Sequence, residues 1–457
     1  MWKPKQVCKC ENNEVSNRVL IDVSHTSRKI LNSGVQRVVR NICRFAKQSA
    51  PGLDMQTVVV RRNSFHPIDL TDLRPRNRVR ETILHAMLQS YQAAAKIVSK
   101  LLPLTNPRRW TSPSTEHSGV ANFPLQPFKK LNVAQFFARE VEISNGDLLI
   151  MPDAYWAKSE VWPAVKAAKA RGARIAIVIY DLIPITHPSF VSEKAAKSFD
   201  LYLRNVAQYA DMVVAISETV RNQLEQLFRQ SEYECSNDCV FASFELGAEF
   251  EAKEGNVREH IQEIFPPDAN NSPHLMVATF DPRKNHSFVL DAFEKVWQHY
   301  PERKLCFIGG VGWLCEDVIE RIQQHPKYGK QLFALHDVSD VELHYCYRRA
   351  RSVLMPSIVE GFGLPIAEAL WHQRHVFASG TDIHREVGRD ECEYFSLDTP
   401  RDLAKMMIAW ETQQDDCSPR KDSSYQPISW DQSVAGLIEQ CTSQLFPDTA
   451  QTDKQAA

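Results

Sequence analysis

The sequence lacks any apolar stretch long enough to cross a membrane as a helix. None of its apolar runs approaches the roughly 20 residues that such a helix needs. Its N-terminus, Met1–Lys5, also lacks the apolar core of a signal peptide. A formal net charge of −2 over 457 residues gives no general attraction to nucleic acid or to a membrane. We therefore expect a cytoplasmic protein that binds no nucleic acid, with any membrane contact peripheral at the inner face of the cytoplasmic membrane.

The eleven cysteines lack the spacing of a disulfide framework or of a zinc site. Cys8 and Cys10 form one close pair and Cys235 and Cys239 another, but neither has the paired spacing of a zinc ribbon. Secreted proteins that depend on disulfides are small and dense in cysteine. We therefore expect reduced cysteines, as in an ordinary cytosolic protein.

Alternating apolar runs and helical patterns indicate two doubly wound α/β domains that face each other across a cleft. Residues 19–23 are continuously apolar, which is typical of a parallel strand buried on both faces. Gly34 then precedes apolar residues at helical spacing over 35–45. In the first domain, 1–250, further strands are expected at 56–61, 147–152, 174–181, 211–217 and 240–246, and helices at 158–170, 192–210 and 218–230.

The second domain is expected over 251–429, with a linker rich in charged residues and proline somewhere within 251–272. Its strands are expected at 275–279, 304–308, 331–335, 352–355 and 375–378, and its helices at 287–299, 316–324, 341–350 and 365–371. A terminal amphipathic helix over 430–446 precedes a polar tail, 447–457, which we expect to be disordered.

Residues 62–140 interrupt the alternation with a segment rich in proline, arginine and serine. One long helix is expected there, over about 79–102. Between Arg74 and Trp110 eight Lys or Arg face a single acid, and the helix has an apolar stripe. Two interpretations remain open: a basic amphipathic helix that lies on an anionic membrane surface, or an insertion that packs on its own domain.

The stretch Ser352–Leu370 combines a short strand, a glycine-containing loop and a helix that opens at Pro365. Proline suits the first turn because its missing N–H would have no partner there. The free amides of a helix start beside such a loop favour an anion. Glu360 and Glu368 bracket the loop, and carboxylates accept hydrogen bonds from sugar hydroxyls. The pattern indicates a ligand that carries both phosphate and hydroxyl groups.

Two more features follow strands of the same domain. Arg283 and Lys284 come after the first strand, where they could neutralise a diphosphate, and Gly309–Gly312 comes after the second. Each feature also has an ordinary structural interpretation. Arg283 and Lys284 could be an exposed basic pair, and the glycines an incomplete dinucleotide fingerprint. Glu368, in the stretch described above, could be an acid favoured by the helix dipole. Because ligands bind at the carboxyl ends of parallel strands, all three together favour a shared diphosphate site.

These motifs resemble a known family, the retaining nucleotide-sugar glycosyltransferases of family 4, which have the GT-B fold. Glu360 and Glu368 in Pro356–Leu370 are similar to its Glu-x7-Glu signature. Other segments resemble its remaining motifs in the same order: 279–286, 310–313, 382–388 and 428–430.

The first domain resembles the bacterial polysaccharide and O-antigen mannosyl- and rhamnosyltransferases of this family. The resemblance rests on Ile21–Val23 with Gly34–Arg37, on Tyr180–Pro188, and on Ser217 with Arg221. Many members have histidine where this chain has Tyr180, so whether Tyr180 or His187 takes part in catalysis stays open.

The resemblance implies a role for each matching residue. Arg283 and Lys284 would hold the donor diphosphate, and Glu368 would accept from the ribose hydroxyls. Glu360 would face the donor sugar, whose hydroxyls and phosphate the amides of Gly361, Phe362, Gly363 and Leu364 would cover. Asp181 would point toward the reacting anomeric carbon, and Gly34 would let its loop close over the diphosphate.

The implied activity is transfer of a hexose, with mannose or rhamnose favoured, to a glycan or lipid-linked acceptor in surface polysaccharide or lipopolysaccharide biosynthesis. The donor would be GDP-mannose, dTDP-rhamnose or a UDP-hexose, and the anomeric configuration would be retained. No cofactor or metal is expected, since Arg283, Lys284 and the helix start would stabilise the leaving diphosphate. The alternatives are a nucleotide-sugar epimerase or hydrolase and a catalytically silent binding subunit of the same fold.

Overall fold

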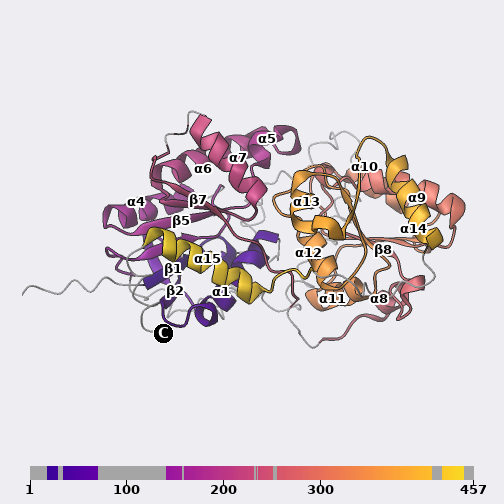
Figure 1. The fold of residues 1–457 in the computed structure, drawn as a ribbon, viewed down its shortest axis with the longest axis horizontal. Coiled ribbons are helices and arrows are strands. Elements are labelled where there is room, and N and C mark those ends of the chain that lie inside the picture. The colour runs from indigo at the N-terminus through magenta and orange to yellow at the C-terminus, as the bar shows by residue number, and fades with distance from the viewer. Residues whose placement is uncertain are drawn as a thin grey trace, which may run out of the picture.

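The computed structural model describes residues 18–28, 34–69, 140–156, 159–230, 233, 235–250, 255–413 and 425–446. They form two α/β domains, each built on one twisted sheet (Figure 1). The expected basic helix over 79–102 and the expected disordered tail over 447–457 lie outside the described residues.

The first domain has a seven-stranded sheet in the order β3-β2-β1-β4-β5-β6-β7. All neighbours are parallel except β2 and β3, which form a hairpin at the edge. The strands are β1 Arg18–Asp22, β2 Asp54–Arg61, β3 Ser64–Pro67, β4 Leu148–Met151, β5 Arg174–Ile179, β6 Met212–Ala215 and β7 Val240–Ser243. The longer helices are α1 Gly34–Ser49, α4 Trp162–Ala170, α6 Glu193–Tyr209 and α7 Glu218–Gln230.

The second domain has a six-stranded parallel sheet in the order β10-β9-β8-β11-β12-β13. Its strands are β8 His274–Val277, β9 Leu305–Ile308, β10 Leu332–Leu335, β11 Val353–Met355, β12 Val376–Ser379 and β13 Glu393–Phe395. Its helices are α8 Glu259–Ile264, α9 His286–His299, α10 Glu316–Gln323, α11 Asp340–Arg349, α12 Leu364–Trp371, α13 Asp382–Gly388 and α14 Pro400–Gln413. The prediction of two Rossmann-like domains, the GT-B architecture, is confirmed.

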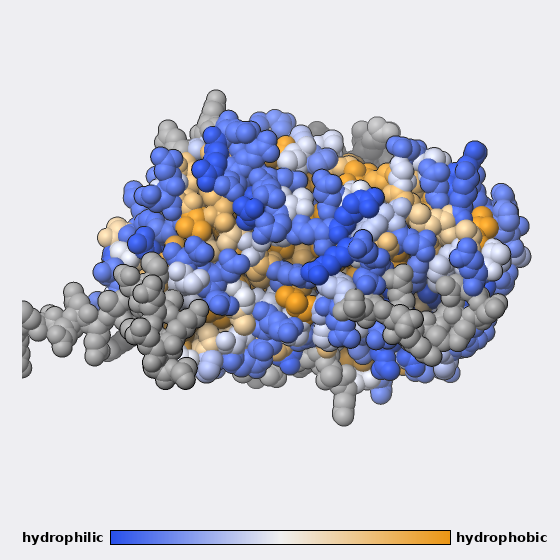
Figure 2. Space-filling model, in the orientation of Figure 1, coloured by the Kyte–Doolittle hydropathy of each residue, from blue (hydrophilic) through white to orange (hydrophobic). Residues whose placement is uncertain are grey.

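Apolar side chains cover both faces of each sheet. In the first domain α1 packs on one face, and α4, α6 and α7 pack on the other. In the second domain α11 and α12 cover one face, and α9 and α14 cover the other. One of these cores is continuous between the domains. The face of the molecule shown in Figure 2 is mostly hydrophilic, with hydrophobic residues in scattered groups.

The terminal helix α15, Trp430–Leu445, returns to the first domain and packs beside α1 (Figure 1). The returning chain runs alongside the outgoing one, since Ala248 N donates to Ile428 O at 3.0 Å. A side chain at Gly247 would come within 2.5 Å of the Trp430 backbone. Residues 247–248, at the end of the first domain, and residues 428–430, at the start of α15, therefore lie side by side.

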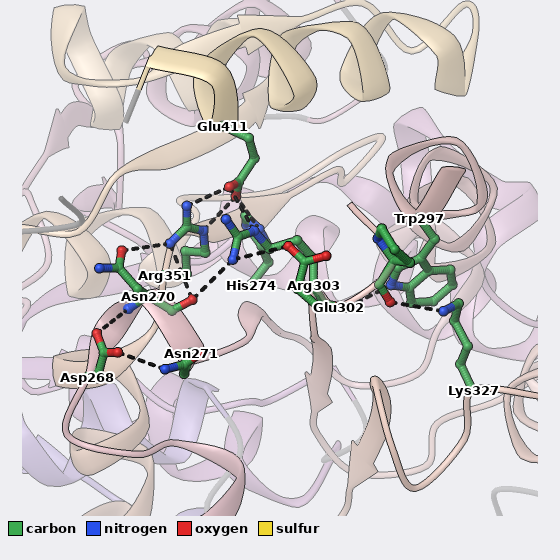
Figure 3. A network of polar contacts seen from close by, with 11 residues as sticks. Asp268, Asn270, Asn271, His274, Trp297, Glu302, Arg303, Lys327, Arg351 and Glu411 are labelled. Atoms are coloured by element: carbon green, nitrogen blue, oxygen red, sulfur yellow. Dashed lines mark hydrogen bonds and ion pairs between the residues drawn. The ribbon is translucent and has the colours of Figure 1, made fainter. Parts of the chain in front are cut away.

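A buried ionic network ties α14 to the strands of the second domain (Figure 3). Glu411 accepts hydrogen bonds from Arg351 and Arg303, and its carboxylate also contacts His274. Glu411 and His274 are fully buried. Among the described residues, no helix has the length and apolar character required to cross a membrane.

Candidate active site

The loop between β11 and α12 begins the site from the second domain. Gly363 precedes α12 with φ of 96°, a left-handed conformation that favours glycine. Pro365 stands in the first helical turn, as its sequence position predicts. The amides of this helix start therefore lie beside a glycine-containing loop.

Arg283 and Lys284 lie in the loop after β8, held against the β11 loop. Asp281 caps their short 3-10 turn by accepting from Arg283 N at 3.0 Å. Ile358 N donates to Arg283 O at 2.8 Å, which joins the two loops. Both cations then reach Glu360: Arg283 Nη1 lies 2.9 Å from Oε2, and Lys284 Nζ pairs with Oε1. Three predicted site residues are thus in direct contact.

The charged groups of this cluster shift one another's pKa values. Burial acts to raise the pKa of Glu360, but Lys284 and Arg283 outweigh it and lower that pKa to about 2. Burial lowers the pKa of Lys284, against the opposing effect of Glu360. Glu360 is therefore a carboxylate at neutral pH, and it partly neutralises the two cations until an anionic ligand competes for them.

Asp181 reaches this cluster from the first domain, at the end of β5. Its Oδ1 accepts from Ile183 N at 3.0 Å, so the carboxylate is fixed by the short helix α5, Ile183–Thr186. Burial raises the pKa of Asp181, while Arg283 opposes that shift. The loop between β11 and α12, residues 356–363, which we name the donor loop, is close, because a Cβ on Gly361 would lie 1.9 Å from Tyr180 O and 3.1 Å from Asp181 Cβ. The domains meet at the predicted catalytic residues.

Tyr180 and His187 differ in where their side chains are held. The Tyr180 hydroxyl donates to Pro152 O at 2.6 Å and is buried within the first domain. His187 Nδ1 lies 2.9 Å from the hydroxyl of its neighbour Thr186, and its ring stacks on Phe190. The Tyr180 contact anchors the strand end that presents Asp181.

The Glu368 side chain does not face open space. It contacts an arginine of the first domain. Its side chain is 2% exposed and pairs with Arg37, which is 18% exposed. The Arg37 guanidinium also lies over the Phe250 ring, 4.5 Å from the centroid. Burial raises the pKa of Glu368, and Arg37 opposes that shift.

The other glycines singled out in the sequence differ in how closely other atoms approach them. Gly34 begins α1, and a Cβ there would meet no atom within 4 Å. In the loop after β9, a Cβ on Gly309 would lie 1.9 Å from Ala278 O, and Gly312 N donates to Phe280 O at 3.0 Å. Glycine there lets the loops after β8 and β9 pack together, which is a structural role.

Comparison with known proteins indicates the family of the second domain. Residues 257–425 match the family described as "Glycosyl transferases group 1". The chain carries a glycosyltransferase domain. The match covers the part of the chain that carries the predicted motifs, so the glycosyltransferase resemblance of the second domain is confirmed.

Similar proteins include mannosyltransferases of Escherichia coli. The serotype-specific mannosyltransferase WbdA is 27% identical over 304 residues, which is 65% of this chain and 37% of WbdA. O-antigen chain mannosyltransferase B is 26% identical over 208 residues, 43% of this chain and 50% of that protein. The chain thus spans little more than a third of WbdA. Among solved structures, Anabaena HepE in complex with UDP and glucose matches 96% of this chain and 99% of its own, at 12% identity and a TM-score of 0.49.

Three residues that the sequence reasoning did not assign lie at or beside this candidate site. Arg37 pairs with Glu368. The feature of the sequence that could have pointed to Arg37 is its place in the Gly34–Arg37 motif. The His384 ring lies beside Gly363: a Cβ on that glycine would be 3.4 Å from His384 Cδ2. Glu386, in the same helix α13, contacts the first domain. Both α13 residues lie in the segment 382–388 that resembles a family motif, but no role had been attached to them.

Proposed function

We propose that this chain is a hexosyltransferase that uses a nucleotide sugar as donor and retains the anomeric configuration. The observation that carries the proposal is the cluster of Arg283, Lys284 and Glu360 in the glycosyltransferase domain, met by Asp181 from the other domain. Two cations beside a helix start suit a diphosphate, and two carboxylates suit the hydroxyls and the reacting carbon of a sugar.

The relatives favour mannose as the transferred sugar. WbdA and O-antigen chain mannosyltransferase B are both described as mannosyltransferases, and the second as acting on an O-antigen chain. We therefore propose GDP-mannose as the first donor to test, with dTDP-rhamnose and UDP-hexoses next, and a growing surface glycan or lipid-linked glycan as acceptor.

The proposed chemistry relies on charge that is already in place. When the bond from the anomeric carbon to the diphosphate breaks, negative charge grows on the leaving group. Arg283, Lys284 and the amides at the start of α12 would stabilise it, with no metal needed. Glu360 would accept from hydroxyls of the sugar, and Asp181 would stabilise the positive charge that develops on the anomeric carbon.

A donor screen tests the proposal. The protein is incubated with radiolabelled GDP-mannose, dTDP-rhamnose and UDP-hexoses, each with and without a mannose-containing lipid-linked glycan. We expect sugar to appear in the glycan from one donor, most strongly GDP-mannose, and to the same extent with and without a chelator of divalent metals. NMR of the product should show the anomeric configuration of the donor.

The other outcomes separate the alternatives. Release of free sugar at the same rate with and without acceptor would indicate a hydrolase, and isomerised nucleotide sugar an epimerase. No turnover of any donor, together with nucleotide binding, would indicate a silent binding subunit. Loss of transfer in the chelator would contradict the metal-independent chemistry.

A lipid-linked acceptor would bring the enzyme to a membrane surface, where the basic segment 74–110 would bind. We expect the full chain to float with anionic vesicles more strongly than a variant that lacks 74–110. Equal flotation of the two would contradict this membrane contact.

A further inference from the structure

A carboxylate of the second domain caps a helix of the first domain. Glu386, in α13, accepts from Glu218 N at 2.7 Å through one oxygen and from Thr219 N at 2.8 Å through the other. The Thr219 hydroxyl donates to the same carboxylate at 2.5 Å. These two amides are the first of α7, and the first amides of a helix have no partner within it. The helix dipole also favours a negative charge at this end.

Ser217, the residue that would ordinarily cap α7 from within the first domain, makes one hydrogen bond to the helix and one to the second domain. Ser217 precedes α7, and its Oγ accepts from Val220 N at 3.2 Å. The same hydroxyl donates its proton across the domain boundary, to Gly361 O at 2.8 Å. The start of α7 therefore holds two parts of the second domain at once, the donor loop through Ser217 and α13 through its first two amides.

The position of this contact links it to the site. Gly361, which Ser217 holds, lies against the backbone carbonyl of Tyr180 and the side chain of Asp181. Helix α13 also carries His384 next to Gly363 of the same loop. Figure 1 places α7 at the side of the first domain that faces α13. The Glu386 contact thus sits at the joint where the two halves of the site meet.

The contact can form only when the domains are together. Glu386 is not fully buried, and its partners are backbone and hydroxyl groups at a helix end, so water can replace it when the domains separate. Separation would remove three charge-assisted hydrogen bonds without unfolding either domain.

We propose that Glu386 is a positioning residue: by capping α7 it holds the domains in the arrangement that brings Asp181 to the donor loop. This inference rests on the proposed transfer function. Since the diphosphate site lies in the second domain, loss of Glu386 leaves nucleotide binding intact and lowers the rate of the step that needs Asp181.

The test compares Glu386→Ala with Asp382→Asn, a matched control that removes an exposed carboxylate from the same helix. For Glu386→Ala we expect kcat to fall by about 100-fold, the cost of a small misplacement of reacting groups. The Kd for the product nucleotide and the melting temperature should remain those of the wild type. Asp382→Asn should leave all three unchanged. An unchanged kcat in Glu386→Ala, or an equal loss of kcat and of nucleotide affinity, would overturn the proposal.

A second variant and a second readout keep the inference separate from the proposed function. Thr219→Val removes one of the three donors and should lower kcat less, with no added effect in Glu386→Ala. Fully additive losses would contradict a shared contact. Small-angle scattering should show a larger radius of gyration for Glu386→Ala than for the wild type, and this holds even if no donor is turned over. An equal radius of gyration would overturn the positioning role of Glu386. A larger radius without turnover of any donor would overturn only the transfer function.

Discussion

Arg37 and Glu368 form an ion pair between the two domains although 331 positions separate them in the chain. Glu368 is the residue that the family resemblance assigns to the ribose of the donor. The structure shows it engaged by an arginine that in turn lies over Phe250. The carboxylate of the predicted nucleotide site is therefore also a contact of the domain interface.

Arg37→Ala should destabilise the protein because it leaves the carboxylate of Glu368 buried and unpaired. Removing one partner of a buried pair costs about 3 kcal/mol. Arg44→Ala, an exposed arginine on the same helix, should cost less than about 0.5 kcal/mol. Chemical denaturation measures both. Equal stabilities of the two variants would show that the pair contributes nothing to the fold.

Lys284→Ala and Glu368→Ala should each weaken nucleotide-sugar binding by roughly 1–3 kcal/mol, the range for a lost charge-assisted hydrogen bond. Lys284 would lose a diphosphate contact and Glu368 a ribose contact. Titration calorimetry with the donor identified by the screen measures the change. Lys330→Ala is a suitable control because that lysine is exposed at the opposite edge of the sheet, before β10. Unchanged affinity in both site variants would remove the assigned donor site.

Much of the fold could be predicted because apolar runs and helical periodicity report burial locally. The predicted bounds of α7 match those in the structure, and those of α15 differ by one residue. The sequence reasoning missed β13 and α14, since a three-residue strand has little periodicity and no motif marks α14. Strand β3 was also missed: it lies at the start of a segment interpreted as irregular.

The site was predictable where its residues lie in one domain. Arg283, Lys284 and Glu360 follow neighbouring parallel strands, so topology alone brings them to one edge of the sheet. The partners of Glu368 and Glu386 could not be predicted this way. They depend on how the two domains dock, and no local pattern encodes a contact between segments so far apart in the chain.

Gly361→Ala should prevent the domains from meeting. Its Cβ would lie 1.9 Å from Tyr180 O, a backbone atom that cannot move aside as a flexible side chain could. Transfer should fall by about 100-fold, while the second domain still binds nucleotide. Gly310→Ala is the control, because a Cβ there meets nothing within 4 Å. Wild-type kcat in Gly361→Ala would show that the closed arrangement is not the reacting one.

Asp181→Asn should lower kcat and leave the fold intact. Asparagine retains the Oδ1 acceptor for Ile183 N, so α5 keeps its contact, whereas the negative charge that we propose acts on the anomeric carbon is lost. We expect a loss of at least about 100-fold in kcat with an unchanged melting temperature. Retention of most activity would exclude a catalytic role for this carboxylate.

Glu411→Gln should destabilise the second domain in a pH-dependent way without affecting donor binding. Burial alone would raise the pKa of Glu411, but His274 and Arg351 outweigh it and hold that pKa below its usual value of 4.5. The folded pKa is thus below the unfolded one, so the stabilisation is complete above about pH 5 and is lost as pH falls. At pH 7 the variant should be less stable by about 3 kcal/mol, and the gap to wild type should narrow below about pH 5.

The network also supplies the control for this measurement. Glu302 is 62% exposed and lies 3.7 Å from Arg303, a member of the same network (Figure 3). Glu302→Gln should therefore change stability by less than about 0.5 kcal/mol at any pH. Denaturation of the three proteins from pH 7 to pH 3 separates the cases. A gap between wild type and Glu411→Gln that stays constant over this range would show that the ionised carboxylate is not what the surrounding cations stabilise.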